Sequence, residues 1–391
     1  MKKLLTIILA AAMVLSLAAC GGSSSASTAT STKQETAAAS TKAESAATQA
    51  ASTKAESAAT QAESAPAEEA STASADIDPA VLGTFEFSFT CHDPDTSAKV
   101  QYMQSLCDEV YEKTNGGVKM TMYNGGTLVA STDVAQAVED GAADIGWMFT
   151  TFFPGEFPLS DVITLPRIFE TNIQANEVLL DLLANNERVQ EEMSRYHILS
   201  VSMNPMNTYY ANKELNTPED FVGLQLRAPA GSATEVTKLL GANPILMGPG
   251  DVYESIEKNV LDGYVFEPSG VKSFNLQEVT KYYLDLPLYC GIFYVVMNND
   301  KWDSLPVEYQ DIITEVWEKG SIGQTEVFNA DVEAAMPLYA EAGLTAIEPS
   351  AEITEAIDAA AQTYIEEYIA ANDCADIYEE VLMYKEQHPA K

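Results

Sequence analysis

The chain is short of basic residues and of histidine. Its 391 residues hold 21 Lys and Arg against 58 Asp and Glu, which gives a formal net charge of −37, and it has three histidines: His92, His197 and His388. Nucleic-acid phosphates demand a basic protein face, so this charge argues against a nucleic-acid partner. Three scattered histidines also disfavour a histidine-rich metal site and provide no convincing nucleophile–base pair.

Two catalytic motifs are also missing. The sequence contains neither an H-E-x-x-H zinc motif nor a G-x-S-x-G nucleophile elbow. A surface hydrolase is therefore a weak alternative, and we expect no catalytic residue, no metal and no cofactor.

Cysteines are few, and none of them forms a C-x-x-C pair. After Cys20 the chain holds Cys91, Cys107, Cys290 and Cys374, without metal-ligand spacing to histidine. Cys91 and Cys107 either pair or remain isolated buried thiols, and the sequence leaves both open. Nothing after residue 20 resembles a membrane span.

The first residues are typical of an exported lipoprotein. Lys2 and Lys3 precede an apolar run, residues 4–19, that is shorter than the roughly 20 residues needed to cross a bilayer. The run ends in Leu-Ala-Ala-Cys, which matches a bacterial lipobox, with Cys20 as the residue to be lipidated. We interpret residues 1–19 as a lipoprotein signal peptide, although an ordinary signal peptide with an incidental cysteine is the alternative. The predicted location is extracytoplasmic, lipid-anchored to the outer face of the bacterial cell membrane.

Residues 20–80 have the composition of a tether. Ser, Ala, Thr, Gln, Lys and Glu dominate, and the twelve letters AASTKAESAATQ run over residues 38–49 and again over 50–61. Such a segment carries too little apolar surface to offset the cost of ordering its backbone. We predict a disordered Ser/Ala/Thr tether between the lipid anchor and a folded region.

The folded region alternates strand and helix patterns. Residues 85–89 alternate Phe with polar residues, residues 97–113 have helical spacing, and VKMTMY (118–123) alternates again before Asn-Gly-Gly. This order predicts an α/β fold with a largely parallel sheet, in which ligands collect at the carboxyl ends of the strands. Those ends are the loops 91–95, 147–150 and 227–231.

The last 80 residues predict amphipathic helices. We expect breaks near Pro306, Gly320, Gly343 and Pro349, and a helix over residues 353–383 that is interrupted near 372–374.

Six motifs in order make the folded region resemble a known family. They are GGVKMTMYNGGTL, VEDGAADIGW, FPGEFPLSDVITLPRIF, GLQLRAPAG, LGANPILMGPGDVYESIEKNVLDG and LQEVTKYYL. Together they are similar to the extracytoplasmic solute receptors of tripartite ATP-independent periplasmic (TRAP) transporters, which include C4-dicarboxylate and sialate receptors. The resemblance implies a two-lobed α/β periplasmic-binding-protein-like fold with a hinged cleft and a long C-terminal helix across both lobes. It also implies delivery of a small carboxylate ligand to a membrane permease.

We divide the folded region by this resemblance. Lobe one is expected to comprise residues 81–204 plus 293–331. Lobe two is expected to comprise residues 205–292 plus 332–391, including the C-terminal helices. We expect the protein to be a monomer.

The resemblance also assigns a role to Arg227 in GLQLRAPAG, because the family's arginine at this position pairs with the ligand carboxylate. The chemistry agrees, since a guanidinium is always charged and its planar fork matches a carboxylate in bidentate fashion. The alternative is a structural ion pair with one of the many acids of the chain.

Departures from the family pattern bear on the ligand. Asn207 aligns with the second arginine of sialate receptors, and Phe266 aligns with a frequent asparagine, with Glu267 next to it. An aromatic wall around one arginine suits a monocarboxylate with an apolar or aromatic body. Alternatives are a dicarboxylate or sugar-acid receptor of the same fold, or an adhesin. The predicted ligand-binding residues are Arg227, Trp147, Phe149, Asn207, Tyr209, Tyr210, Phe266, Glu267, His92 and Asp93.

Four of these assignments have alternatives. Tyr210 and Phe266, like the further candidate Tyr289, are as well explained by core packing. His92 is equally plausible as a hydrogen-bonded loop residue. Glu267 would repel an anion, so it either points outward or meets a cationic group such as an amine on the ligand.

Overall fold

The structure is a computed structural model that describes residues 77–390. The predicted signal peptide, Cys20 and nearly all of the predicted tether therefore lie outside the described residues. Within residues 77–390, no helix has both the length and the apolar character of a membrane span.

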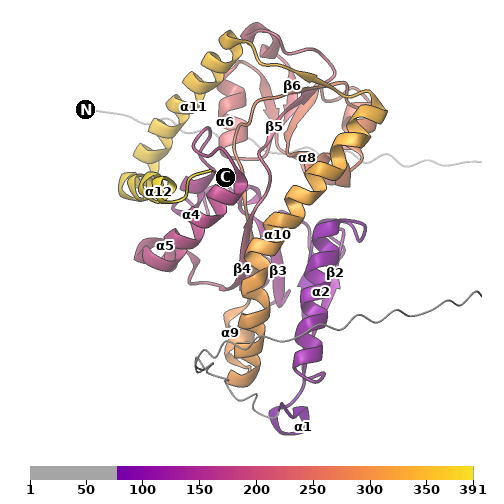
Figure 1. Cartoon of the computed structure of the whole chain (residues 1–391), viewed down its shortest axis with the longest axis vertical. Helices are drawn as coiled ribbons and strands as arrows, with labels where there is room; N and C mark the ends of the chain where they lie inside the picture. The colour runs from indigo at the N-terminus through magenta and orange to yellow at the C-terminus, as the bar shows by residue number, and fades with distance from the viewer. Residues whose placement is uncertain (1–76, 391) are drawn as a thin grey trace, which may run out of the picture. The chain divides into compact units, whose positions relative to one another are not determined.

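Two mixed β-sheets organise the described region (Figure 1). The first has the strand order β2-β1-β3-β10-β4, and the second β11-β9-β5-β8-β6-β7. The first comprises β1 (Phe85–Thr90), β2 (Val118–Tyr123), β3 (Ile145–Phe149), β4 (His197–Met203) and β10 (Ile292–Met297). The second comprises β5 (Thr208–Ala211), β6 (Gln225–Arg227), β7 (Asn243–Ile245), β8 (Gly263–Phe266), β9 (Tyr282–Leu284) and β11 (Thr345–Ile347). We call the sheets with their helices lobe one and lobe two.

The expectation of a largely parallel sheet is confirmed, with one strand in each sheet that runs against its neighbours. β10 is antiparallel to β3 and β4, and β5 is antiparallel to β8 and β9. Both strands begin where the chain has just crossed from the other lobe, between β4 and β5 and between β9 and β10. A crossing strand enters from the opposite side, so its direction is set by the crossing and not by a βαβ unit.

The two crossings form a hydrogen-bonded hinge. Asn207 and Tyr289 pair as an isolated antiparallel bridge, in which the Asn207 N–H donates to the Tyr289 carbonyl at 2.7 Å. The Asn204 N–H donates to the Gly291 carbonyl at 3.1 Å. Two strands of backbone thus connect the lobes side by side.

Helices cover both sheets. Those of lobe one are α1 (Pro79–Leu82), α2 (Ala98–Lys113), α3 (Val134–Glu139), α4 (Asn172–Asn185), α5 (Glu187–Met193) and α9 (Asn299–Asp303). Those of lobe two are α6 (Ser232–Leu239), α7 (Val252–Glu257) and α8 (Pro268–Ser273). Short 3-10 turns are η1 (Thr150–Phe152), η2 (Ser160–Thr164), η3 (Pro218–Phe221), η4 (Pro249–Asp251) and η5 (Leu276–Glu278).

The predicted helix across both lobes is α10 (Val307–Ala342), which packs against α2 and β4 of lobe one and against α8 of lobe two (Figure 1). The expected break at Gly320 was wrong, since α10 passes through it without interruption. A Cβ at Gly320 would lie 3.1 Å from Leu106 Cδ1 and 3.3 Å from Ser200 Cβ. The glycine therefore lets α10 approach α2 and β4 closely instead of ending the helix.

The last two helices are α11 (Ala351–Asn372) and α12 (Ala375–Gln387), with the predicted interruption at Asp373 in a left-handed conformation. Residues 332–391 were expected to belong to lobe two. α12 packs instead against α4, and its buried Ile377 and Val381 join the core of lobe one. The chain thus returns to lobe one at its end.

The cysteines in the described region are free and buried, so Cys91 and Cys107 do not pair. Both lie in the core of lobe one, where a thiol packs as a small apolar group.

Candidate functional site

Three strand ends meet at a cavity between the lobes. The loop after β1 carries His92 and Asp93, β3 ends in Trp147-Met148-Phe149, and β6 ends at Arg227. The cavity has about 420 Å³ of space between its lining atoms, including its open mouth. We call it the central cavity. Eight of the ten predicted residues line it: His92, Asp93, Trp147, Phe149, Asn207, Arg227, Phe266 and Glu267.

Arg227 is a buried guanidinium, with 2% of its surface exposed. Its Nη1 donates to the Val265 carbonyl at 3.0 Å and its Nε to the Met247 carbonyl at 3.3 Å, while its guanidinium carbon lies 4.7 Å from the centre of the Phe266 ring. Burial lowers the pKa of Arg227 to about 10, so the group stays charged at neutral pH.

No carboxylate within residues 77–390 lies within ion-pair distance of Arg227, although the chain is rich in acids. A structural ion pair therefore does not explain this arginine in the described region. A buried charge without a counter-ion is costly, and an anion bound in the central cavity would relieve that cost.

An aromatic stack forms one wall of the central cavity. The His92 ring stacks on Trp147 with centroids 4.8 Å apart, Trp147 on Phe293 at 4.5 Å, and Phe293 on Phe149 at 4.4 Å. Burial lowers the pKa of His92, so its ring is neutral at neutral pH. His92 Nδ1 and Trp147 Nε1 are buried without a hydrogen-bond partner in the described region. This wall offers planar apolar surface to a ligand body.

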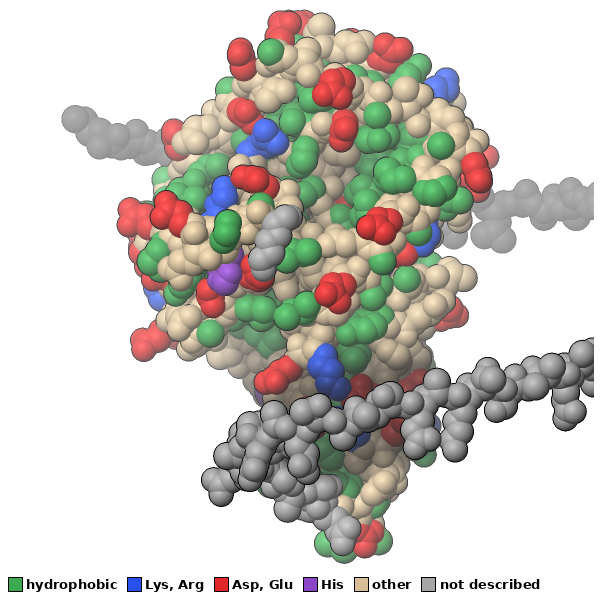
Figure 2. All heavy atoms as spheres, viewed as in Figure 1, with side chains coloured by type: hydrophobic (Ala, Val, Ile, Leu, Met, Phe, Trp, Pro, Cys, Tyr) green, Lys and Arg blue, Asp and Glu red, His purple; other side chains and the backbone are tan. Residues whose placement is uncertain are grey.

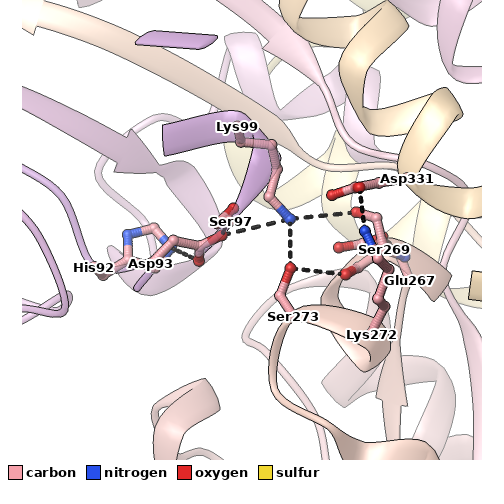
Figure 3. Close-up of polar contacts among 9 residues, drawn as sticks. All are labelled: His92, Asp93, Ser97, Lys99, Glu267, Ser269, Lys272, Ser273 and Asp331. Atoms are coloured by element: carbon pink, nitrogen blue, oxygen red, sulfur yellow. Dashed lines mark hydrogen bonds and ion pairs between the residues drawn. The ribbon is translucent and has the colours of Figure 1, made fainter. Parts of the chain in front are cut away.

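A polar cluster borders the central cavity on another side (Figure 3). Lys99 Nζ lies 3.4 Å from Asp93 Oδ2 in lobe one and donates to Ser269 Oγ at 3.4 Å and Ser273 Oγ at 3.2 Å in lobe two. Lys99 therefore connects the lobes through α8. The further members of the polar cluster are His92, Ser97, Glu267, Lys272 and Asp331.

Glu267 is 4% exposed and does not point into solvent. Its Oε2 accepts a hydrogen bond from the Ser269 N–H at 2.6 Å, which caps α8. Burial raises the pKa of Glu267, and Lys99 opposes that rise. Of the two alternatives left by the sequence, the outward-facing one is wrong.

Tyr209 and Tyr210 were predicted in the site, but neither lines the central cavity. The Tyr209 hydroxyl lies 3.2 Å from Thr237 Oγ1 in one core of lobe two, and the Tyr210 hydroxyl lies 3.1 Å from the Tyr339 hydroxyl in the other. Neighbouring side chains of a strand point to opposite faces of a sheet, and both faces of β5 are covered. Tyr289 packs in the same core as Tyr209. Burial raises the pKa of Tyr289, and the nearby Arg227 guanidinium opposes part of that rise.

Asn207 lines the central cavity and also belongs to the hinge. Its Nδ2 donates to the Tyr289 carbonyl at 3.2 Å and to Asn204 Oδ1 at 3.4 Å. The Asn207 side chain thus helps to hold the hinge together, and a contact with a ligand would be a further interaction of the same side chain.

Sequence reasoning missed nine residues of the lining: Lys99, Phe152, Asn204, Pro229, Pro249, Gly270, Phe274, Phe293 and Phe328. Two carried a usable signal. Lys99 opens the helix after the β1 loop, and Phe152 follows the β3 loop by two residues. Phe293 and Phe328 are far from any strand-end loop, on β10 and α10, and only the tertiary fold brings them here. The described residues contain no group of three or more His, Cys, Asp or Glu placed to hold a metal ion.

The fold and the interlobe cavity define a two-lobed solute-binding protein. A family model described as bacterial extracellular solute-binding protein, family 7, matches residues 89–372. The chain therefore belongs to this family, and it is an extracytoplasmic solute receptor of the TRAP type.

Three similar proteins indicate the range of the family. The monocarboxylate 2-oxoacid-binding periplasmic protein of Nostoc sp. is 23% identical over 73% of this chain and 79% of its own length. The C4-dicarboxylate-binding periplasmic protein of Rhodobacter capsulatus is 27% identical over 61% of this chain and 72% of its own. A marine metagenome TRAP solute-binding protein, solved with 3-hydroxybenzoate, superposes with a TM-score of 0.72 at 22% identity, over 78% of this chain and 99% of the other.

Proposed function

We propose that this receptor binds a small monocarboxylate with an apolar or aromatic body in the central cavity, with Arg227 as the partner of the carboxylate. The observation that carries the proposal is the buried Arg227 guanidinium, which faces an aromatic-lined cavity and has no carboxylate partner within residues 77–390. A bound carboxylate would accept bidentate hydrogen bonds there, and the stack of Trp147, Phe293 and Phe149 would cover the body of the ligand. Binding of 3-hydroxybenzoate by the marine receptor is consistent with this ligand class.

The proposed mechanism is closure of the lobes around the ligand. Lobe one, over residues 81–204 and 293–331, contributes the loops with His92 and Trp147, and lobe two contributes Arg227 and Phe266. A ligand that touches both lobes binds the closed arrangement better and shifts the population toward it. The closed receptor then delivers the ligand to its membrane permease, and we propose that it does so as a monomer.

The test is a thermal-shift and calorimetry screen of wild-type protein with carboxylates of several classes: benzoate, 3-hydroxybenzoate, 2-oxo acids, succinate and glucuronate. A ligand at 100 times its Kd stabilises the fold by about 2.7 kcal/mol. We expect such a shift with monocarboxylates. Stabilisation by neutral sugars or metal ions alone would reject the proposal.

Arg227→Lys provides the residue-level test. Loss of the bidentate fork should weaken carboxylate binding by at least about tenfold, or ~1.4 kcal/mol. Arg188→Lys is the matched control, because Arg188 pairs with Asp376 on the surface, outside the cavity lining. Calorimetry that returns the wild-type Kd for Arg227→Lys would refute the carboxylate assignment.

We further propose that Cys20 carries the lipid that anchors the receptor outside the cell. The supporting feature is the Leu-Ala-Ala-Cys sequence, followed by a repeat-rich segment without aromatic residues. In a bacterial host, the wild type should fractionate with membranes and incorporate labelled palmitate. Cys20→Ala should do neither, and palmitate incorporation by that variant would disprove the assignment.

A further inference from the structure

The carboxylates of Asp93 and Glu267 both border the central cavity, one from each lobe, and each is 4% exposed. We propose that they form a second ligand subsite, which accepts a hydrogen bond from a donor group on the ligand and rejects a second carboxylate. This inference rests on the proposed function, because it assumes that the first carboxylate binds Arg227.

Asp93 has one oxygen available to a ligand. Its Oδ2 accepts from Ser97 Oγ at 2.9 Å and lies 3.4 Å from Lys99 Nζ. Its Oδ1 has His92 Nε2 at 3.7 Å, beyond hydrogen-bond distance. An ionised carboxylate offers acceptor sites on both oxygens, so Oδ1 retains capacity for a donor.

Glu267 has the same property on the side of lobe two. Its Oε2 accepts the Ser269 N–H at 2.6 Å, and the Ser269 hydroxyl also hydrogen-bonds the carboxylate. An ionised carboxylate has about four acceptor sites, so capacity for a ligand donor remains. The two carboxylates thus present acceptors and no donor of their own.

Lys99 does not convert this subsite into a site for anions. Its ammonium group has three donors, and Asp93, Ser269 and Ser273 occupy its surroundings at 3.2–3.4 Å. Lys272 Nζ lies 2.5 Å from Asp331 Oδ1, so the charges of this ion pair offset each other. One cation among two cavity-facing carboxylates leaves the subsite negative when both are ionised, and a second ligand carboxylate would face like charge in a buried setting.

Different neighbours act on the subsite and on Arg227. The pKa of Lys99 responds to Asp93 and Glu267, and that of Glu267 to Lys99 and Asp93. The pKa of Arg227 responds to its burial and to Tyr289. A ligand therefore meets a cation at Arg227 and acceptors at Asp93 and Glu267, which fits a hydroxy acid or an amino acid better than a diacid.

Calorimetry at pH 8 with two matched series tests the inference. The aromatic series is benzoate, 3-hydroxybenzoate, 3-(aminomethyl)benzoate and benzene-1,3-dicarboxylate. The aliphatic series is butanoate, 4-hydroxybutanoate, 4-aminobutanoate and succinate. In the series that binds, we expect a hydroxyl or ammonium group to tighten binding over the parent acid by about tenfold, and the second carboxylate to weaken it by at least about tenfold. The hydroxy and amino members distinguish the two kinds of donor.

Glu267→Gln tests the residue itself. Glutamine keeps an oxygen for the Ser269 N–H but places a donor where Oε1 was, so the ratio of diacid to parent affinity should rise by about tenfold or more. Glu333→Gln, an exposed change on α10, should leave all ratios unchanged. If Glu267→Gln does not fold, the order of wild-type affinities within each series of acids still tests the inference.

The outcomes separate the two claims. Equal affinity for parent and donor-bearing acids, or tighter binding of the diacid, would overturn the inference and leave the carboxylate receptor intact. A complete lack of binding by all eight acids, together with a lack of binding by the 2-oxo acids of the first screen, would overturn the proposed function itself.

Discussion

Burial shifts the pKa values of Arg227 and Asp161 in opposite directions. Arg227 remains charged in the central cavity because its proton is held tightly even when burial lowers the pKa to about 10. Asp161, in η2, has a buried Oδ1, and burial raises its pKa to about 7, although a hydrogen bond from Thr150 opposes the rise. Glu192 adds to that rise through like charge. Arg227 is therefore suited to hold an anion, and Asp161 makes the stability of the fold depend on pH.

Asp161→Asn should therefore stabilise the protein in a pH-dependent way. An acid with a folded pKa of about 7 and an unfolded value near 3.8 binds more protons in the folded state between these values. Wild-type stability should decrease as pH rises from about 4 to about 7, and the penalty is then complete above 7. The amide avoids this penalty, so the variant should gain about 1–3 kcal/mol over wild type at pH 8 and little at pH 4. Urea unfolding at both pH values measures the difference in free energy of unfolding between variant and wild type, with Glu333→Gln as control. A gain that is larger at pH 4 would contradict the assignment.

At the scale of elements, strands and helices decide which side chains reach the site. β5 places Tyr209 and Tyr210 on two covered faces, so adjacency to Asn207 in the sequence did not bring them to the cavity. β10 places Phe293 between Trp147 and Phe149, although it is distant from both in sequence. Gly291 precedes β10 at the hinge, and a Cβ there would lie 2.4 Å from a ring carbon of Phe149.

Gly291→Ala should therefore disturb the aromatic wall. The added methyl group must displace the Phe149 ring from its stack on Phe293, and overpacking of this kind costs about 1–3 kcal/mol. We expect a lower melting temperature and weaker monocarboxylate binding, measured by calorimetry. Gly250→Ala is the control, because a Cβ there meets no atom within 4 Å. Unchanged binding by Gly291→Ala would show that the Phe149 stack does not support the ligand site.

At the scale of the whole molecule, the acidic surface opposes the arrival of an anionic ligand. The formal net charge is −37. On the face drawn in Figure 2, Asp and Glu side chains are scattered widely and Lys and Arg side chains are fewer. Arg227 is buried between lobes, so its attraction operates at short range, while the surface charge acts at long range until salt screens it.

The association rate of a monocarboxylate should consequently rise with ionic strength. Stopped-flow measurements between about 10 and 150 mM salt should show faster association and a nearly constant dissociation rate, because the Debye length falls from about 30 to about 8 Å. A neutral ligand analogue, if bound, should show no such trend. An association rate that falls with salt would mean that a local positive field dominates the approach.

Local patterns in the sequence were sufficient for part of this architecture. Alternating Phe residues predicted β1, and the order of six motifs identified the family. The strand-end positions of His92 and Trp147 predicted that these residues meet, because the carboxyl ends of neighbouring parallel strands share an edge. Arg227 lies at the end of β6 in the other sheet, and the two-lobed fold brings it to the same cavity. Gly320 shows the limit of such patterns, since a glycine in a helix signals a break or a close contact equally well.

Tertiary structure alone decided the rest. Lys99 meets Ser269 across 170 residues of sequence, α12 returns to lobe one, and β5 and β10 reverse direction because the chain crosses between lobes. The sequence by itself determined the family, the arginine and the aromatic character of the site, since these are properties of residue types at local spacings. Which aromatic rings and which acids line the cavity depended on long-range packing, which no local pattern encodes.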